Sequence, residues 1–245
     1  MVAARSCGVT GLSMFIGLGP MLRVPETRAT REIRVTTKEP FRWWRLRGIV
    51  VPIAALFTVG TIWSMYDVVW PQYLAARGNS PLVIGLSVSI FAMPILVLAR
   101  AGGRLADRAD RRKLVTAGLL AVAACAATYP FLRLLAVILV IGGIEAIATV
   151  ILEPTLFAVI GDSTPVQLRG RAMGLGGLYQ FSGMAFGAAV LGSLYGVNAG
   201  LPFWGGSGIL LGGALVCALW LPGRTAVTSH VTQPAAFPVL EREQG

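Results

Sequence analysis

The chain has 245 residues, of which 55% are hydrophobic and only 13% are charged. Because an ordinary soluble domain carries about 25% charged residues, this composition excludes that class and predicts an integral membrane protein. The formal net charge is +10, but the basic residues gather in the gaps between apolar runs, so the charge does not predict a nucleic-acid-binding face.

The first segment of the chain is apolar over residues 8–22, but it is rich in glycine and interrupted by Pro20. It is therefore marginal as a membrane span. Arg5 would be the positive region of a signal peptide, yet no small-residue cleavage site follows. Residues 23–47 come next and carry eight Lys or Arg. A basic segment of this kind is expected beside a membrane, on its cytoplasmic side.

Six apolar segments follow, and each is long enough to cross a hydrocarbon core of about 30 Å. Residues 172–223 contain no Asp, Glu, Lys, Arg or His and are too many for one membrane-spanning helix. The turn-rich sequence Asn198-Ala-Gly-Leu-Pro202 is expected to divide them. The predicted spans are residues 48–66, 82–100, 114–132, 134–160, 172–197 and 202–221.

The loops between these spans alternate in charge. Six bases lie in the loop of residues 100–113 and two in that of residues 161–171, whereas the intervening loops carry only Arg77 and Arg133. The tail after the last span carries two more bases. By the positive-inside rule, the basic set and both ends of the six-span block are predicted to be cytoplasmic.

Aromatic residues are consistent with this arrangement. Trp63, Tyr66 and Trp70 fall where the first span is predicted to leave the membrane, and Trp204 and Trp220 bracket the last span. Tryptophan and tyrosine are enriched at membrane interfaces. We therefore expect all five side chains to lie in the interfacial belts.

The basic loop after the second span has the most specific sequence, Gly103-Arg-Leu-Ala-Asp-Arg-Ala-Asp-Arg-Arg-Lys113. It resembles the signature loop of the major facilitator superfamily, which joins the second and third helices of each six-helix half. Asp110 stands where the family usually has a second glycine. The sequence Arg169-Gly-Arg-Ala-Met-Gly174 before the fifth span and Pro25-Glu-Thr-Arg28 also resemble family segments.

The resemblance implies an all-α polytopic membrane protein with six transmembrane helices in two inverted three-helix repeats. It implies that these are helices seven to twelve, the C-terminal half of a transporter normally about twice this length, and thus a truncated or partial member. The expected parts are a remnant of a preceding transmembrane helix (1–22), a basic cytoplasmic linker (23–47), the six-helix bundle (48–224) and a cytoplasmic tail (225–245).

Two acids lie inside the fourth span. Glu145 is near its centre, Glu153 is two turns closer to the cytoplasm, and Thr149 is four residues from each. These three residues form one polar stripe on the helix. A carboxylate in hydrocarbon is costly and usually faces a cavity, so the stripe is expected to face protein or water. Asp67, near the outer end of the first span, is expected to be structural or to reach the interface.

The resemblance implies more for these acids. In the family the first helix of each triplet lines the central cavity, and here those helices carry Asp67, Glu145 and Glu153. Glu145 is thus a candidate proton-coupling carboxylate. The alternative is a carboxyl group that neighbouring helices hold by hydrogen bonds, and the sequence leaves both open.

The family's signature loop is a conformational latch, which implies that role for Gly103, Asp107, Arg108, Arg111 and Arg112. Asp110 is expected only to offset the basic charge of the loop. The fifth span is rich in glycine, and its Gly183-x-x-x-Gly187 matches the small-residue motif of close helix packing.

The predicted function is transport of a small solute across the cell (inner or plasma) membrane by alternating access, as proton-coupled export of the major facilitator type. The expected partners are lipid, the solute, protons and a second six-helix bundle; nucleic acid is not expected. Neither a cofactor nor a metal is expected, because the three cysteines lie far apart in the sequence: Cys7, Cys125 and Cys217.

Two other classes fit the number of spans. A regulatory membrane subunit that transports nothing has no feature against it. An intramembrane serine protease is favoured by Gly205-Gly-Ser-Gly208. That chemistry needs a histidine beside the serine, and the only histidine, His230, lies in the polar tail beyond the last span.

Overall fold

A computed structural model describes residues 47–221 of the chain. Within this range the side chains of Ile95, Leu96, Ala99, residues 101–103 and residues 105–108 are not described. The predictions for residues 1–22, for the linker up to residue 46 and for the tail 225–245 lie outside the described residues.

The described part of the chain is helical and contains no strand, which confirms the predicted all-α class. The elements are α2 (Arg47–Ser64), the π-helical η2 (Met65–Val69), α3 (Trp70–Ala75), α4 (Pro81–Arg108), α5 (Arg111–Thr128), the 3₁₀ turn η3 (Tyr129–Phe131), α6 (Leu135–Asp162), the 3₁₀ turn η4 (Val166–Leu168), α7 (Arg169–Val197) and α8 (Leu201–Trp220). Four helical segments in this range are long and apolar enough to cross a membrane: Arg47–Ala75, Arg111–Phe131, Leu135–Asp162 and Leu201–Trp220.

The first span is longer than predicted. The expected end at Tyr66 is wrong, because α2, η2 and α3 form one continuous helical segment from Arg47 to Ala75. Pro71 lacks an N–H group, and its ring crowds the preceding turn of an α-helix. The wider turn of η2 directly before it accommodates this ring, so the helix continues. The turn that follows Ala75 contains Gly78, whose φ of 77° is a left-handed conformation that favours glycine.

The signature loop is shorter than predicted. Helix α4 continues to Arg108 and α5 begins at Arg111, so only Ala109 and Asp110 connect the two helices. The expected loop over residues 100–113 is wrong because a helix does not need to stop at the membrane surface, and α4 continues through this segment despite its two glycines, Gly102 and Gly103. The carboxylate of Asp110 accepts a hydrogen bond from the backbone N–H of Arg112 at 3.0 Å. It therefore caps the N-terminus of α5 and does more than offset charge.

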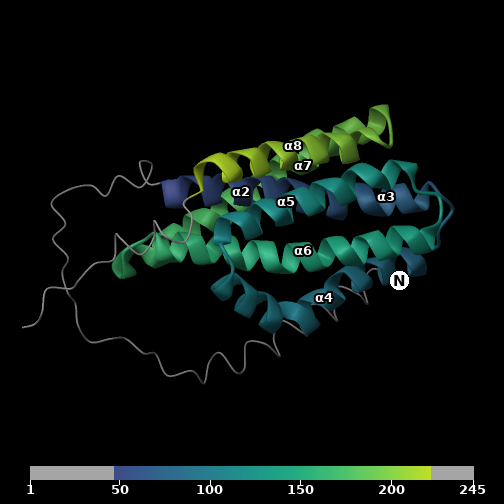
Figure 1. Ribbon diagram of the computed structural model, residues 1–245. Coiled ribbons are helices and arrows are strands. Elements are labelled where there is room, and N and C mark those ends of the chain that lie inside the picture. Colours follow the sequence, from purple (N-terminus) through teal and green to yellow (C-terminus); the bar gives the residue numbers. More distant parts are fainter. Residues whose placement is uncertain (1–46, 222–245) are drawn as a thin grey trace, which may run out of the picture. The chain divides into compact units, whose positions relative to one another are not determined.

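Packing between the helices follows the pattern of two three-helix repeats. The first long helix of each triplet packs most extensively against the second helix of the other, α2 against α7 and α6 against α4. The third helices of the triplets, α5 and α8, pack against each other. Figure 1 shows α6 between α4 and α5. This exchange of partners is what an inverted repeat produces.

The contact between α2 and α7 is a close approach of two backbones. A Cβ atom placed on Gly183 would lie 2.9 Å from the carbonyl carbon of Phe57, and one on Gly187 would lie 2.9 Å from the Cα atom of Thr61. A glycine of α2 is equally close to α7, since a Cβ on Gly60 would lie 2.9 Å from the carbonyl carbon of Gln180. These three positions leave no space for a side chain.

The interfacial belt is only partly as expected. Trp204 and Trp220 are exposed on α8, whereas Trp70 is only 1% exposed. The indole N–H of Trp70 donates to the hydroxyl of Ser87 on α4 at 3.0 Å. The predicted interfacial position of Trp70 is therefore wrong, because the first span continues past it and turns the ring into the bundle.

Candidate functional site

A pocket of about 490 Å³ opens between α2, η2, α4 and α6. The structure brings together there all four polar residues that the sequence identifies inside the first and fourth spans: Asp67, Glu145, Thr149 and Glu153. Five aromatic side chains also line it: Trp63, Tyr66, Trp70, Phe91 and Phe157. Among the described residues, no lysine, arginine or histidine lines this pocket.

Glu145 is the most buried acid of the site, with 3% of its surface exposed. Its Oε1 atom accepts a hydrogen bond from the hydroxyl of Tyr66. Its Oε2 atom accepts another from the hydroxyl of Tyr129 at 2.6 Å. Both carboxylate oxygens are thus held by phenols, one from η2 and one from η3, which satisfies the polar atoms of a buried acid.

Tyr129 is held firmly in place. Its side chain is fully buried, and its ring packs edge-on against Trp70 with the centroids 5.2 Å apart. Phe203 on α8 packs against the same ring at 5.6 Å. The hydroxyl of Tyr73 donates to the backbone carbonyl of Tyr129 at 2.5 Å. These contacts fix the direction of the Tyr129 phenol toward Glu145.

Tyr66 is held more loosely. It lies in the π-helical segment η2, and it is half-buried at the pocket wall. Its ring packs against Trp70 at 5.8 Å and against Phe91 of α4 at 5.7 Å. A π-helical turn inside a longer helix is frequently found at functional sites. Here it directs a phenol and, at the next position, the carboxylate of Asp67 toward one pocket.

The polar stripe of α6 has a second hydrogen-bonded acid. Thr149 donates to the backbone carbonyl of Glu145 at 3.0 Å and thus satisfies its own hydroxyl within the helix. The Oε1 atom of Glu153 accepts from the side-chain amide of Gln180 on α7 at 2.7 Å. The two acids of α6 therefore have different partners, phenols for one and an amide for the other.

Asp67 does not lie at the end of its helix. Eight residues follow it up to and including Ala75, about 12 Å along a helix axis. The side chain is exposed and lines the same pocket as Glu145. Its expected position at the outer end of the first span is therefore wrong, because that span is longer than predicted.

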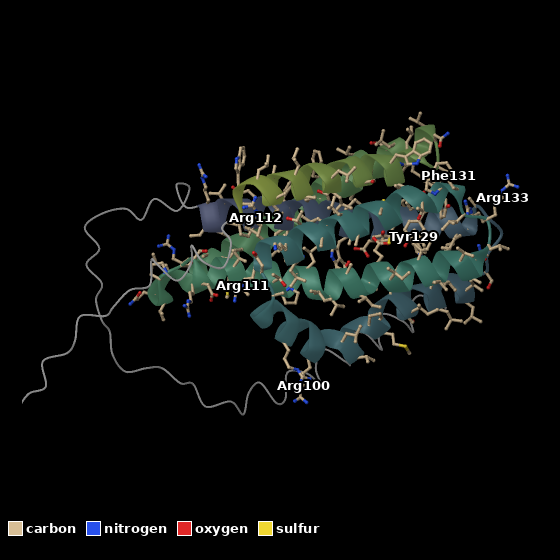
Figure 2. All side chains as sticks on the ribbon, viewed as in Figure 1. Arg100, Arg111, Arg112, Tyr129, Phe131 and Arg133 are labelled. Carbon is tan, nitrogen blue, oxygen red and sulfur yellow. The ribbon has the colours of Figure 1, made fainter. Side chains whose placement is uncertain are left out.

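Arginines near the two ends of α5 lie at opposite ends of the bundle. Figure 2 shows Arg111 and Arg112 far from Arg133, which lies at the opposite end near Phe131. Arg111 forms an ion pair with Asp162 at the end of α6. Arg112 donates to the backbone carbonyl of Ala218 in the last turn of α8. These two bases link the start of α5 to the ends of two other helices.

The rest of the predicted latch lies outside what the structure describes, since the side chains of Gly103, Asp107 and Arg108 are not described. The backbone of these three residues forms part of the last turns of α4.

Ser207, the serine of the protease-like sequence, is buried in the packing of α8 against α5. Its hydroxyl donates to the backbone carbonyl of Ala123 at 2.9 Å, and 6% of the residue is exposed. His230 lies outside the described residues. The observed role of Ser207 is thus a hydrogen bond between two helices.

Three polar residues of the site are not predicted from the sequence: Tyr66 as a partner of Glu145, Tyr129 and Gln180. Gln180 has a signal, because it is the only Asn or Gln in residues 172–197, and an amide inside a span usually finds a partner. Tyr66 and Tyr129 stand near span ends, where tyrosine is expected at the interface. Nothing local distinguishes them from belt residues.

The chain was compared with known proteins. A search of curated proteins found no match. Residues 53–243 match the model of the family described as Major Facilitator Superfamily. The match covers most of the chain and includes every residue of the pocket, and the chain therefore belongs to the major facilitator superfamily.

Proposed function

We propose that this membrane transporter exports a small solute in exchange for protons and that Glu145 carries the proton. The observation that carries the proposal is a buried carboxyl group at the wall of a pocket, with two phenols as its hydrogen-bond partners. Ionised carboxylates inside a membrane are costly, and they mark proton and substrate pathways.

The hydrogen bonds around Glu145 depend on its protonation. The ionised carboxylate only accepts, and both of its oxygens receive a phenol O–H. When a proton arrives on one oxygen, that oxygen becomes a donor, and donation to the phenol beside it requires this phenol to turn its own O–H away. The titratable groups that face Glu145 are the phenols of Tyr66 and Tyr129 and the thiol of Cys125.

A proton on Glu145 therefore acts on the two segments that supply the phenols. Tyr129 is fixed by buried aromatic neighbours, whereas Tyr66 is only half-buried and lies in η2. The response is expected mainly at η2, the π-helical part of the first span. A local change there alters the relative stability of two conformations, which is what alternating access requires.

The test uses inverted membrane vesicles from the cells that naturally make this protein, so that any partner is present. A pH gradient is established, and a pH-sensitive dye reports its collapse when neutral, anionic and cationic solutes are added one by one. We expect one class of solute to release protons from wild-type vesicles. With Glu145→Gln this proton release is lost, while binding of the same solute remains measurable.

The matched control is Asp162→Asn, which removes a carboxylate from the same helix outside the pocket. It is expected to retain proton release. Unchanged proton-driven flux in Glu145→Gln would reduce this residue to a structural role and would overturn the proposal.

We propose that the latch of the signature loop regulates this exchange, with Asp107 as its acid, as the family resemblance implies. Asp107→Asn is expected to shift the balance between inward-open and outward-open states without preventing membrane insertion. Cysteine labelling at a pocket position such as Thr149→Cys reports that balance. Identical labelling rates with and without Asp107→Asn would contradict the latch.

We propose the cell membrane as the location, with the end of Arg111 and Arg112 in the cytoplasm. A variant without native cysteines, carrying Lys113→Cys or Arg133→Cys, is labelled in intact cells with a reagent that does not cross membranes. Only Arg133→Cys is expected to react. Labelling of Lys113→Cys instead would reverse the orientation.

We also propose that a second six-helix bundle completes the transport path. The pocket lies open between helices, and acids that face lipid are costly. The chain expressed alone is expected to insert, to be unstable or to pair with another bundle, and to show no flux in liposomes. A stable purified monomer with solute-specific flux would contradict this partner.

A further inference from the structure

We propose that the pocket between α2, η2, α4 and α6 selects lipophilic organic cations. This inference rests on the proposed function in one respect only, that the pocket is the solute site. It goes further by naming the class of solute: a molecule with a delocalised or shielded positive charge and aromatic or aliphatic surface.

The first argument is charge. Three acids line the pocket, Asp67, Glu145 and Glu153, and among the described residues no base lines it. The one ion pair among the described side chains is at the end of α6, between Arg111 and Asp162. An acid in a membrane needs a proton or a cation to offset its charge. A positively charged solute supplies that charge, whereas an anion is repelled.

The second argument is the aromatic wall. Tyr66, Trp70 and Phe91 form a mutually packed group, with the ring centroids of Trp70 and Phe91 5.2 Å apart and nearly perpendicular. The faces of aromatic rings attract cations, with tryptophan the strongest, and the attraction grows when water is excluded. A small hydrated metal ion does not use such a surface, but an organic cation does.

The third argument is size. A volume of about 490 Å³ falls within the range of about 300 to 1,000 Å³ that holds drug-sized ligands. The rings and the acids line the same pocket, so one bound molecule can contact both kinds of group. The pocket therefore has the dimensions for an organic cation with several rings.

The test is a binding measurement without any ion gradient, so it does not depend on transport. The tagged protein, with any partner that co-purifies, is placed in lipid nanodiscs. Two probes of nearly equal size and opposite charge are compared, tetraphenylphosphonium and tetraphenylborate. Binding to empty nanodiscs is subtracted, because both ions partition into lipid. We expect saturable binding of the cation that is about tenfold or more tighter than that of the anion.

Pocket variants locate the binding. Asp67 is exposed, so Asp67→Asn leaves the packing intact, and we expect about threefold weaker binding of the cation. Glu153→Gln is expected to weaken it by about tenfold, and Phe91→Leu by about threefold. The matched controls are Asp162→Asn and Phe186→Leu, an acid and a ring that do not line the pocket. Both controls are expected to bind like the wild type.

Each outcome has one reading. Equal or tighter saturable binding of tetraphenylborate, or pocket variants that bind the cation as well as the controls do, overturns the inference. If a neutral or anionic solute releases protons through Glu145, the proposed function stands and the cation inference fails. If the cation binds as expected but releases no protons, the inference stands and proton exchange fails.

Discussion

The two faces of the first helical segment, Arg47–Ala75, are built in opposite ways. Toward α7, the backbone at Phe57 and Thr61 lies against the backbone of Gly183 and Gly187, where an added Cβ atom would overlap it. Toward α6, a few residues further along the same segment, the phenol of Tyr66 and the carboxylate of Asp67 line an open pocket.

This difference indicates that the face toward α7 is rigid and that the face toward the pocket can move. Two helices whose backbones touch at a glycine leave no free space between them, since even one added carbon atom would overlap the neighbouring backbone. Such a contact fits in one arrangement only. The pocket face is held by hydrogen bonds and partly exposed rings, which can be exchanged at a small cost in free energy. We infer that α2 and α7 move as one unit and that changes during transport occur at the pocket face.

The largest effect is expected when a methyl group is added on the rigid face. Gly183→Ala places a Cβ atom against the backbone of Phe57, and we expect a loss of about 3 kcal/mol in the free energy of unfolding. Thermal unfolding in detergent measures it. The control is Gly174→Ala in the same helix, where nothing lies within 4 Å of the added atom. Equal stability of the two variants would contradict the rigid contact.

A smaller effect is expected on the pocket face. Tyr129→Phe removes the donor to Glu145 Oε2 in a fully buried position, which should cost about 1 to 2 kcal/mol. Tyr66→Phe, at a half-buried position, should cost less. Both should alter the pH dependence of solute binding, because each phenol bonds the carboxyl group of Glu145, which we propose takes up the proton. Tyr179→Phe, on the exposed surface of α7, is the control and should change neither measurement.

At the basic end, Arg112 tests whether the signature sequence also holds the bundle together. Arg112→Gln removes the donor to the carbonyl of Ala218 at the end of α8. A loss of about 1 kcal/mol is expected. The neighbouring Lys113→Gln removes an equal charge from an exposed side chain and should be close to neutral. The same thermal measurement compares them, and a larger effect at Lys113 would contradict this assignment.

The smallest effect is expected at the exposed ion pair. The side chains of Arg111 and Asp162 are 22% and 46% exposed, so Asp162→Asn should cost less than about 1 kcal/mol. The difference from the wild type should shrink further in high salt, because exposed charges are screened. A cost that exceeds that of Tyr129→Phe would mean that the end of the bundle, and not the pocket, limits stability.

Much of the fold is predictable from the sequence. The membrane class, the six long helical segments and the turn at Asn198–Pro202 depend on composition along the chain, because local hydropathy decides whether a segment partitions into lipid or water. The polar stripe of Glu145, Thr149 and Glu153 follows from helical periodicity alone. The errors are at the ends of helices, where Pro71 does not stop the first span and the signature loop remains helical.

The partners of the acids were decided only by the tertiary structure. Tyr66 is 79 residues away from Glu145 in the sequence, and Tyr129 is 16 residues away. Whether their phenols reach it depends on how each helix is rotated about its axis and where it crosses its neighbours. Those rotations are set by the close glycine contacts between α2 and α7 and by the π-helical turn of η2. Hydropathy determines that a segment spans the membrane, but it does not specify the rotation that joins two phenols to one buried carboxyl group.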